Sequence, residues 1–115
     1  MNKIVIENIY HKIREASSLE LQKKMWLNKN NDTGMISSYT ELMCGLFDDN
    51  DFDSFIDSEA TKVGLSSTAI SELDKLRNFL NNYHEKKSDE EILNDPEWLK
   101  IVNQAKIVLE KWNIT

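Results

Sequence analysis

The chain of 115 residues has the length of one domain, and its composition, 40% hydrophobic and 30% charged, is typical of a globular protein. Its 20 acidic and 14 basic residues give a net charge of −6, which argues against a general nucleic-acid binder and against an anionic membrane surface as partner. Only three glycines and one proline are present, so a turn-rich all-β fold is not expected.

The first third of the chain predicts two helices and a loop. Apolar residues recur at helical spacing over residues 3–16, which indicates an amphipathic helix, although residues 3–6 are also the one place where a short strand could compete. Ser17 and Glu20 have the spacing of a capping box, so we expect Ser17 to begin a second, short helix. Residues 28–35, rich in Asn and containing Gly34, predict a loop.

The remaining elements are again separated by capping signals. A capping box at residues 38–41 opens a helix with a clear apolar face, and Phe52, Phe55 and Ile56 mark another short helical face. A longer helix follows Ser66 and runs to about residue 83, and a capping box at residues 88–91 opens a single turn.

The last predicted helix begins at Asp95-Pro96, an N-cap followed by proline at the first helical position. No segment alternates with period two for long enough to be a convincing strand. We therefore expect residues 1–115 to form a single all-α domain, a compact irregular bundle of about five to seven helices.

The acidic residues are concentrated in the middle of the chain. Residues 41–59 hold seven acidic and no basic residues, a local charge of −7, whereas residues 1–30 hold six basic and three acidic residues, a local charge of +3. This acidic stretch is either an ordinary solvated surface or a binding surface for a basic protein. The candidate contact residues are Glu41, Asp48, Asp49, Asp51, Asp53, Asp57 and Glu59.

The sequence contains no convincing motif for metal binding, catalysis or nucleotide binding. Asp49 begins a D-x-D-x-D pattern, but a calcium loop needs glycine at its sixth position and glutamate at its twelfth, and Ser54 and Ala60 stand there. Two distant histidines and one cysteine, Cys44, give no zinc-ligand spacing, and acidic neighbours of Cys44 disfavour a thiolate nucleophile. Nucleotide-binding glycine motifs and the G-x-S-x-G motif are absent. We expect neither an enzyme nor a metal or cofactor site.

The same features bear on cellular location. A single cysteine cannot form an internal disulfide, no apolar run is long enough to span a membrane, and Glu7 interrupts the run that a signal peptide needs. The sequence therefore predicts a cytoplasmic protein.

Three segments resemble a known family. ISSYTELMCGLFDD (residues 36–49), DFDSFI (51–56) and SDEEILNDPEW (88–98) look like segments of small bacterial immunity proteins from contact-dependent growth inhibition systems. The resemblance implies a cytoplasmic, non-enzymatic protein that binds a cognate toxin domain, often a nuclease, and blocks or distorts its active site. It transfers no fixed binding residues.

Charge suits such a partner, because a nuclease domain carries a cationic cleft that an acidic helical face can occupy. We expect a basic toxin domain as the partner, a nuclease with an RNase favoured, and no direct binding of nucleic acid, membrane or small-molecule substrate. The alternative is an acidic helical adaptor or regulatory subunit that binds a basic segment of another protein.

Overall fold

The computed structural model describes residues 1–112, and over this range the chain forms seven continuous helical segments and no strand. This confirms the predicted fold class. The segments are α1 (Lys3–Ala16), α2 (Leu19–Leu27), α3 (Tyr39–Cys44) continued by the π-helical turn η1 (Gly45–Asp49), α4 (Phe52–Ser54) continued by the π-helical turn η2 (Phe55–Glu59) and by α5 (Ala60–Lys62), α6 (Ser67–Asn82), α7 (Asp89–Leu93) and α8 (Pro96–Lys111). Residues 3–6, where a strand could compete, belong to α1.

Helix boundaries follow the capping signals, with one correction. The side chains of Ser38, Ser88 and Asp95 each accept a hydrogen bond from a backbone N–H in the first turn of α3, α7 and α8, as the sequence predicts. Helix α2, however, is capped by Ser18 and not by Ser17. The Ser17 amide donates to the carbonyl of Ile13 and so still belongs to the end of α1, which leaves the next residue to begin α2.

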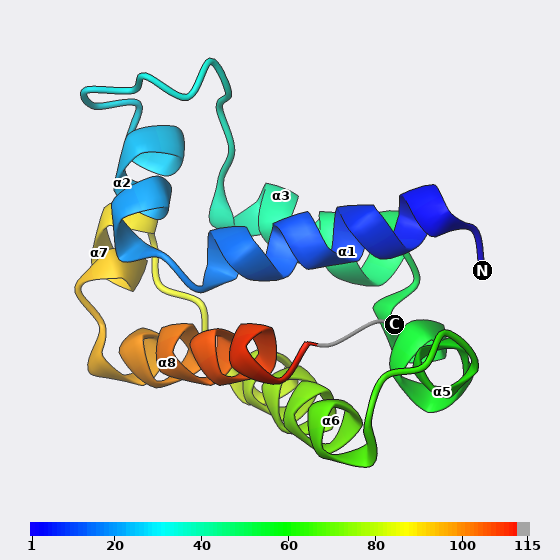
Figure 1. The fold of residues 1–115 in the computed structure, drawn as a ribbon. Helices are drawn as coiled ribbons and strands as arrows, with labels where there is room; N and C mark the ends of the chain where they lie inside the picture. Colours follow the sequence, from blue (N-terminus) through cyan, green and yellow to red (C-terminus); the bar gives the residue numbers. More distant parts are fainter. Residues whose placement is uncertain (113–115) are drawn as a thin grey trace.

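The long helices form the body of the molecule. Helix α8 packs on both α6 and α1, and α2 lies beside α7 at one end (Figure 1). The segment from α4 to α5 covers the other end, where Phe52 and Phe55 are fully buried. The buried apolar residues form one core cluster that draws on every helical segment.

A cluster of aromatic rings joins α2, α3 and α8. The rings of Trp26, Tyr39 and Trp98 lie 5.6–6.4 Å apart between centroids, and Tyr83 contacts both Tyr39 and Trp98. Such edge and tilted contacts add to the free energy that burial of the rings provides. This cluster fixes α3, and with it the acidic stretch that follows, against the long helices.

Two buried polar side chains tie α1, α2 and α8 together. Gln22 is fully buried, donates to the carbonyls of Glu15 and Ala16, and accepts a hydrogen bond from the indole N–H of Trp98 at 2.8 Å. The carboxylate of Glu15, also buried, accepts from the indole N–H of Trp26. Because the NH2 group and the carbonyl oxygen of the Gln22 side chain and one oxygen of Glu15 all have hydrogen-bond partners, the network orients these helices without leaving its buried donors unpaired.

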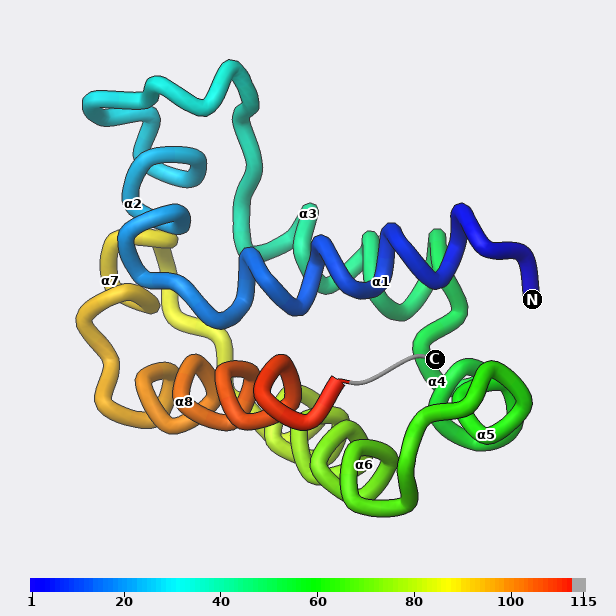
Figure 2. The backbone as a smooth tube through the Cα atoms, viewed as in Figure 1, coloured from blue at the N-terminus to red at the C-terminus, as the bar shows by residue number. Residues whose placement is uncertain are grey.

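The predicted loop after α2 is present and extends from residue 28 to residue 38. Figure 2 shows it projecting beyond α2 and returning to α3. The loop begins at Asn28, which has a left-handed backbone conformation with φ of 52°. Asparagine tolerates this conformation better than most residues, so it ends α2 at little cost.

Candidate functional site

The acidic stretch folds into two short helical segments joined by a tight turn. Two of its carboxylates, Asp48 and Asp49, lie in η1, and two more, Asp57 and Glu59, lie in η2. Between the segments the backbone of Asp51 takes a left-handed conformation with φ of 51°, and the side-chain amide of Asn50 donates to the carbonyl of Gly45 at 2.6 Å. Single π-helical turns are rare and are frequent at functional sites.

Four of the seven predicted contact residues are exposed and carry free carboxylates. In the part of the chain that the structure describes, no cation lies within 4.0 Å of their side chains. They belong to α3, η1 and the turn after it, and three of them, Glu41, Asp48 and Asp49, lie near the thiol of Cys44. We call this set the acidic surface: Glu41, Asp48, Asp49 and Asp51.

Cys44 lies within the acidic surface. Its thiol is exposed, and its pKa is raised by desolvation and then by the nearby carboxylates of Asp48, Asp49 and Glu41. This agrees with the expectation that acidic neighbours disfavour a thiolate at this position. Three carboxylates of the acidic surface therefore act on the same thiol.

Asp53 and Asp57 differ from the acidic surface, because both are already paired. The guanidinium of Arg77, on α6, lies 3.2 Å from Asp53 and 2.9 Å from Asp57, and it also binds Asp74 of its own helix. Partial burial lowers the pKa of Arg77, but the hydrogen bonds that its guanidinium donates to Asp74, Asp57 and Asp53 outweigh this effect and raise the pKa. These two aspartates therefore fasten α4 and η2 to α6 in the free protein.

Glu59 is paired as well. Its carboxylate accepts a hydrogen bond from the amino group of Met1 at 3.0 Å and lies 3.5 Å from the ammonium of Lys62. The hydrogen bond from Met1 lowers the pKa of this carboxyl, and its side chain is only 19% exposed. Both cations lie outside residues 41–59, at 1 and 62, so counting charges inside the stretch could not reveal either pairing.

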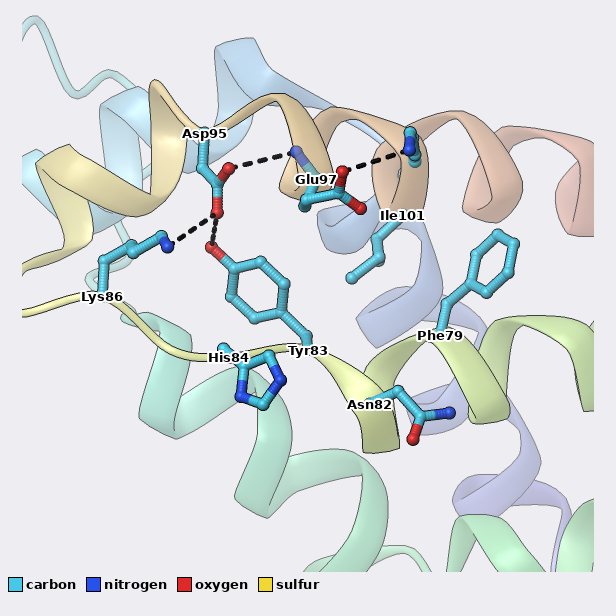
Figure 3. Close-up of a pocket in the computed structure, with 9 residues that line it drawn as sticks. Phe79, Asn82, Tyr83, His84, Lys86, Asp95, Glu97 and Ile101 are labelled. Carbon is cyan, nitrogen blue, oxygen red and sulfur yellow. Dashed lines mark hydrogen bonds and ion pairs between the residues drawn. The ribbon is translucent and has the colours of Figure 1, made fainter.

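A second group of polar side chains lines a cavity of about 470 Å³ between the end of α6 and the start of α8 (Figure 3). The hydroxyl of Tyr83 donates to Asp95 at 2.8 Å, and Lys86 lies 3.8 Å from the same carboxylate. Burial, and then the hydrogen bond to Asp95, raises the pKa of Tyr83. The sequence predicts Asp95 as a helix cap, and it gave no signal that Tyr83 and Asp95 meet.

This cavity is not the better candidate for a binding site, because its charges are already paired. Asp95 caps α8 through the backbone N–H of Glu97 while it accepts from Tyr83, and Glu97 itself pairs with Lys100 at 3.1 Å. Tyr83 and Asp95 thus hold the chain segment between α6 and α8 in place. The hydrogen bond between Tyr83 and Asp95 therefore has a structural role.

The described residues contain no group of three or more histidine, cysteine or acidic side chains placed to hold a metal ion. None of the helices in residues 1–112 is long and apolar enough to cross a membrane. No protein-family model, curated protein or solved structure shows a significant match to this chain.

Proposed function

We propose that this protein is an immunity protein that binds a cationic toxin domain through the acidic surface and covers the active site of that domain. The observation that carries the proposal is the set of exposed, unpaired carboxylates of Glu41, Asp48, Asp49 and Asp51. The resemblance of residues 36–56 and 88–98 to immunity proteins of contact-dependent growth inhibition systems supports the same function. A nuclease, with an RNase favoured, is the proposed toxin activity.

The placement of these carboxylates suits binding rather than folding. No residue of the acidic surface pairs with a cation of the described chain, and the side chain of Asp51 makes no capping hydrogen bond. Four like charges within residues 41–51 repel one another, and this repulsion lowers the stability of the free protein. A cationic cleft that binds nucleic-acid phosphates would relieve the repulsion and would be attracted from a distance.

The mechanism is occlusion without chemistry. The acidic surface competes with the phosphates of the substrate for the cations of the toxin cleft, and the rest of the helical domain excludes the nucleic acid sterically. Electrostatic attraction between the two surfaces accelerates their encounter.

The first experiment is co-expression with the domain encoded by the adjacent gene. Expression of that domain alone is expected to stop growth of a test bacterium, and co-expression of this protein is expected to restore it. Binding of the two purified proteins is then measured by surface plasmon resonance. If the two proteins do not bind, or bind without restoring growth, the immunity function is wrong, and the second outcome favours the adaptor alternative.

Charge variants test the surface itself. Asp48→Asn, Asp49→Asn and Asp51→Asn in one chain are expected to lower the association rate constant about ten-fold at low salt and to flatten its salt dependence. A matched control neutralises three exposed carboxylates elsewhere, Glu85→Gln, Glu90→Gln and Glu110→Gln, and so makes the same change in net charge. An equal effect of both variants would place the contact outside the acidic surface.

Cys44 supplies a chemical-modification check on the wild-type protein. As the single cysteine of the chain, exposed among the carboxylates, it is expected to react slowly with iodoacetamide when free and to be protected further in the complex. A control cysteine, Glu90→Cys in a Cys44→Ser background, should react equally in both states.

A further inference from the structure

A groove of about 750 Å³ opens beside the acidic surface, between α1, α2, the loop of residues 28–38 and η1. Leu21, Met25 and Met35 supply apolar lining. Asp49, a member of the acidic surface, lies on the η1 side of the groove. The groove and the acidic surface therefore share Asp49.

The loop beside the groove exposes two large apolar side chains. Met35 is 61% exposed and Ile36 is 74% exposed, and Ile36 is the most exposed large apolar residue that the structure describes. Exposed apolar side chains that adjoin a groove and a charged rim are typical of protein–protein interaction sites.

Hydrogen bonds hold this loop in one conformation. The side-chain amide of Asn31 donates to the carbonyl of Met35 at 2.6 Å, and the Met35 amide donates to the hydroxyl of Thr33 at 3.1 Å. The amide of Ser37 donates to the carbonyl of Met25, which fastens the loop to α2. The two apolar side chains are thus displayed on an ordered backbone, so binding through them costs little conformational entropy.

The two sides of the groove carry opposite charge. His11, Lys12 and Arg14 line the α1 side and Asp49 lines the η1 side. On the floor, the buried carboxylate of Glu15 accepts hydrogen bonds at Oε2 from Trp26 and Ser37, whereas its Oε1 has only the ammonium of Lys12 nearby, at 3.8 Å. A cationic surface is attracted to the η1 side and repelled from the α1 side, which orients the partner over the acidic surface.

We propose that Met35, Ile36 and this groove form the apolar centre of the interface, with the acidic surface as its charged rim. The inference rests on the proposed function and names the occupant: the same cationic toxin domain, which places an apolar side chain from the edge of its basic cleft into the groove. The rim governs the speed of encounter, and the apolar centre governs the lifetime of the complex.

Binding kinetics test whether the rim governs association and the apolar centre governs dissociation. The binding partner in these measurements is the domain encoded by the adjacent gene. Met35→Gln with Ile36→Gln is expected to raise the dissociation rate constant at least about ten-fold, because apolar anchors carry most of the binding free energy. The association rate constant and its salt dependence are expected to stay within about two-fold of wild type. Leu99→Gln with Ile107→Gln, two exposed apolar residues of α8, is the matched control and should change neither constant.

Oxidation of the wild-type protein is a second measurement that needs no variant. Hydrogen peroxide is expected to convert the exposed Met35 to its sulfoxide in the free protein, and complex formation is expected to slow this conversion several-fold, as read by peptide mass spectrometry. If the proteins bind but neither the dissociation rate of the variant nor the oxidation of Met35 changes, the apolar centre is wrong and the immunity function stands. If no binding occurs at all, the proposed function itself is wrong.

Discussion

Replacing Gln22 by leucine tests how the three helices around it are held together. The side chain is fully buried, and it joins the carbonyls of Glu15 and Ala16 on α1 to the indole N–H of Trp98 on α8. Leucine has a similar volume, so the substitution removes the hydrogen bonds without opening a large cavity. The change in the free energy of unfolding then reports mainly on the polar groups left behind.

The expected loss in the free energy of unfolding is the sum of the costs for the polar groups that lose a hydrogen-bond partner. The indole N–H of Trp98, in a side chain with no exposed surface, loses its acceptor at a cost of about 1–3 kcal/mol. The carbonyl of Glu15 keeps the hydrogen bond from the amide of Ser18, but that of Ala16 loses a donor at a further cost of about 1 kcal/mol. We therefore expect Gln22→Leu to lower the free energy of unfolding by about 2–4 kcal/mol.

Urea unfolding followed by tryptophan fluorescence measures this loss. With a slope of about 2 kcal/mol per molar urea, the middle of the usual range, the midpoint should fall by about 1–2 M while the slope stays constant. Adding Trp98→Phe removes the indole N–H that lacks an acceptor in Gln22→Leu. The double variant should therefore lose less free energy of unfolding than the two single variants lose together. A midpoint shift below about 0.3 M for Gln22→Leu, or strict additivity with Trp98→Phe, would refute the reasoning.

Three further predictions concern the turn, the arginine clamp and the tyrosine–aspartate pair. Asp51→Gly should be more stable than Asp51→Ala by about 1 kcal/mol in the same urea assay, because alanine is strained at the positive φ of this position; equal stability would mean that the turn relaxes. Arg77→Met should lower the urea midpoint more at low salt than at high salt, since it leaves three carboxylates facing one another; a salt-independent loss would contradict the ion-pair account. Tyr83→Phe should be less stable than wild type at neutral pH, and the difference should narrow as pH falls below about 4. The sign follows because the hydrogen bond from Tyr83 lowers the pKa of Asp95, so its stabilisation is complete above the ordinary aspartate pKa and is lost as the folded carboxyl takes up a proton. A difference that stays constant from pH 7 to about 3 would rule out this pairing with the ionised carboxylate.

The local order of the fold was predictable because it depends on residues close in the chain. Helical periodicity and capping side chains determined the helix at 3–16 and the starts of α3, α7 and α8. Where two serines stand side by side, periodicity could not decide between them, since either can cap a helix; the backbone bonds at the end of α1 selected Ser18.

The sequence by itself determined that carboxylates gather at residues 41–59, and the cationic partner inferred from them stays a prediction. Only the tertiary structure decided which of them are free. Arg77 lies 24 residues from Asp53 in the sequence, yet packing of α6 against η2 places it between Asp53 and Asp57, and Glu59 meets Met1 across 58 residues. Helical spacing predicts which side of its own helix a residue occupies, but ion pairs between distant segments form only after the core has set those helices beside each other.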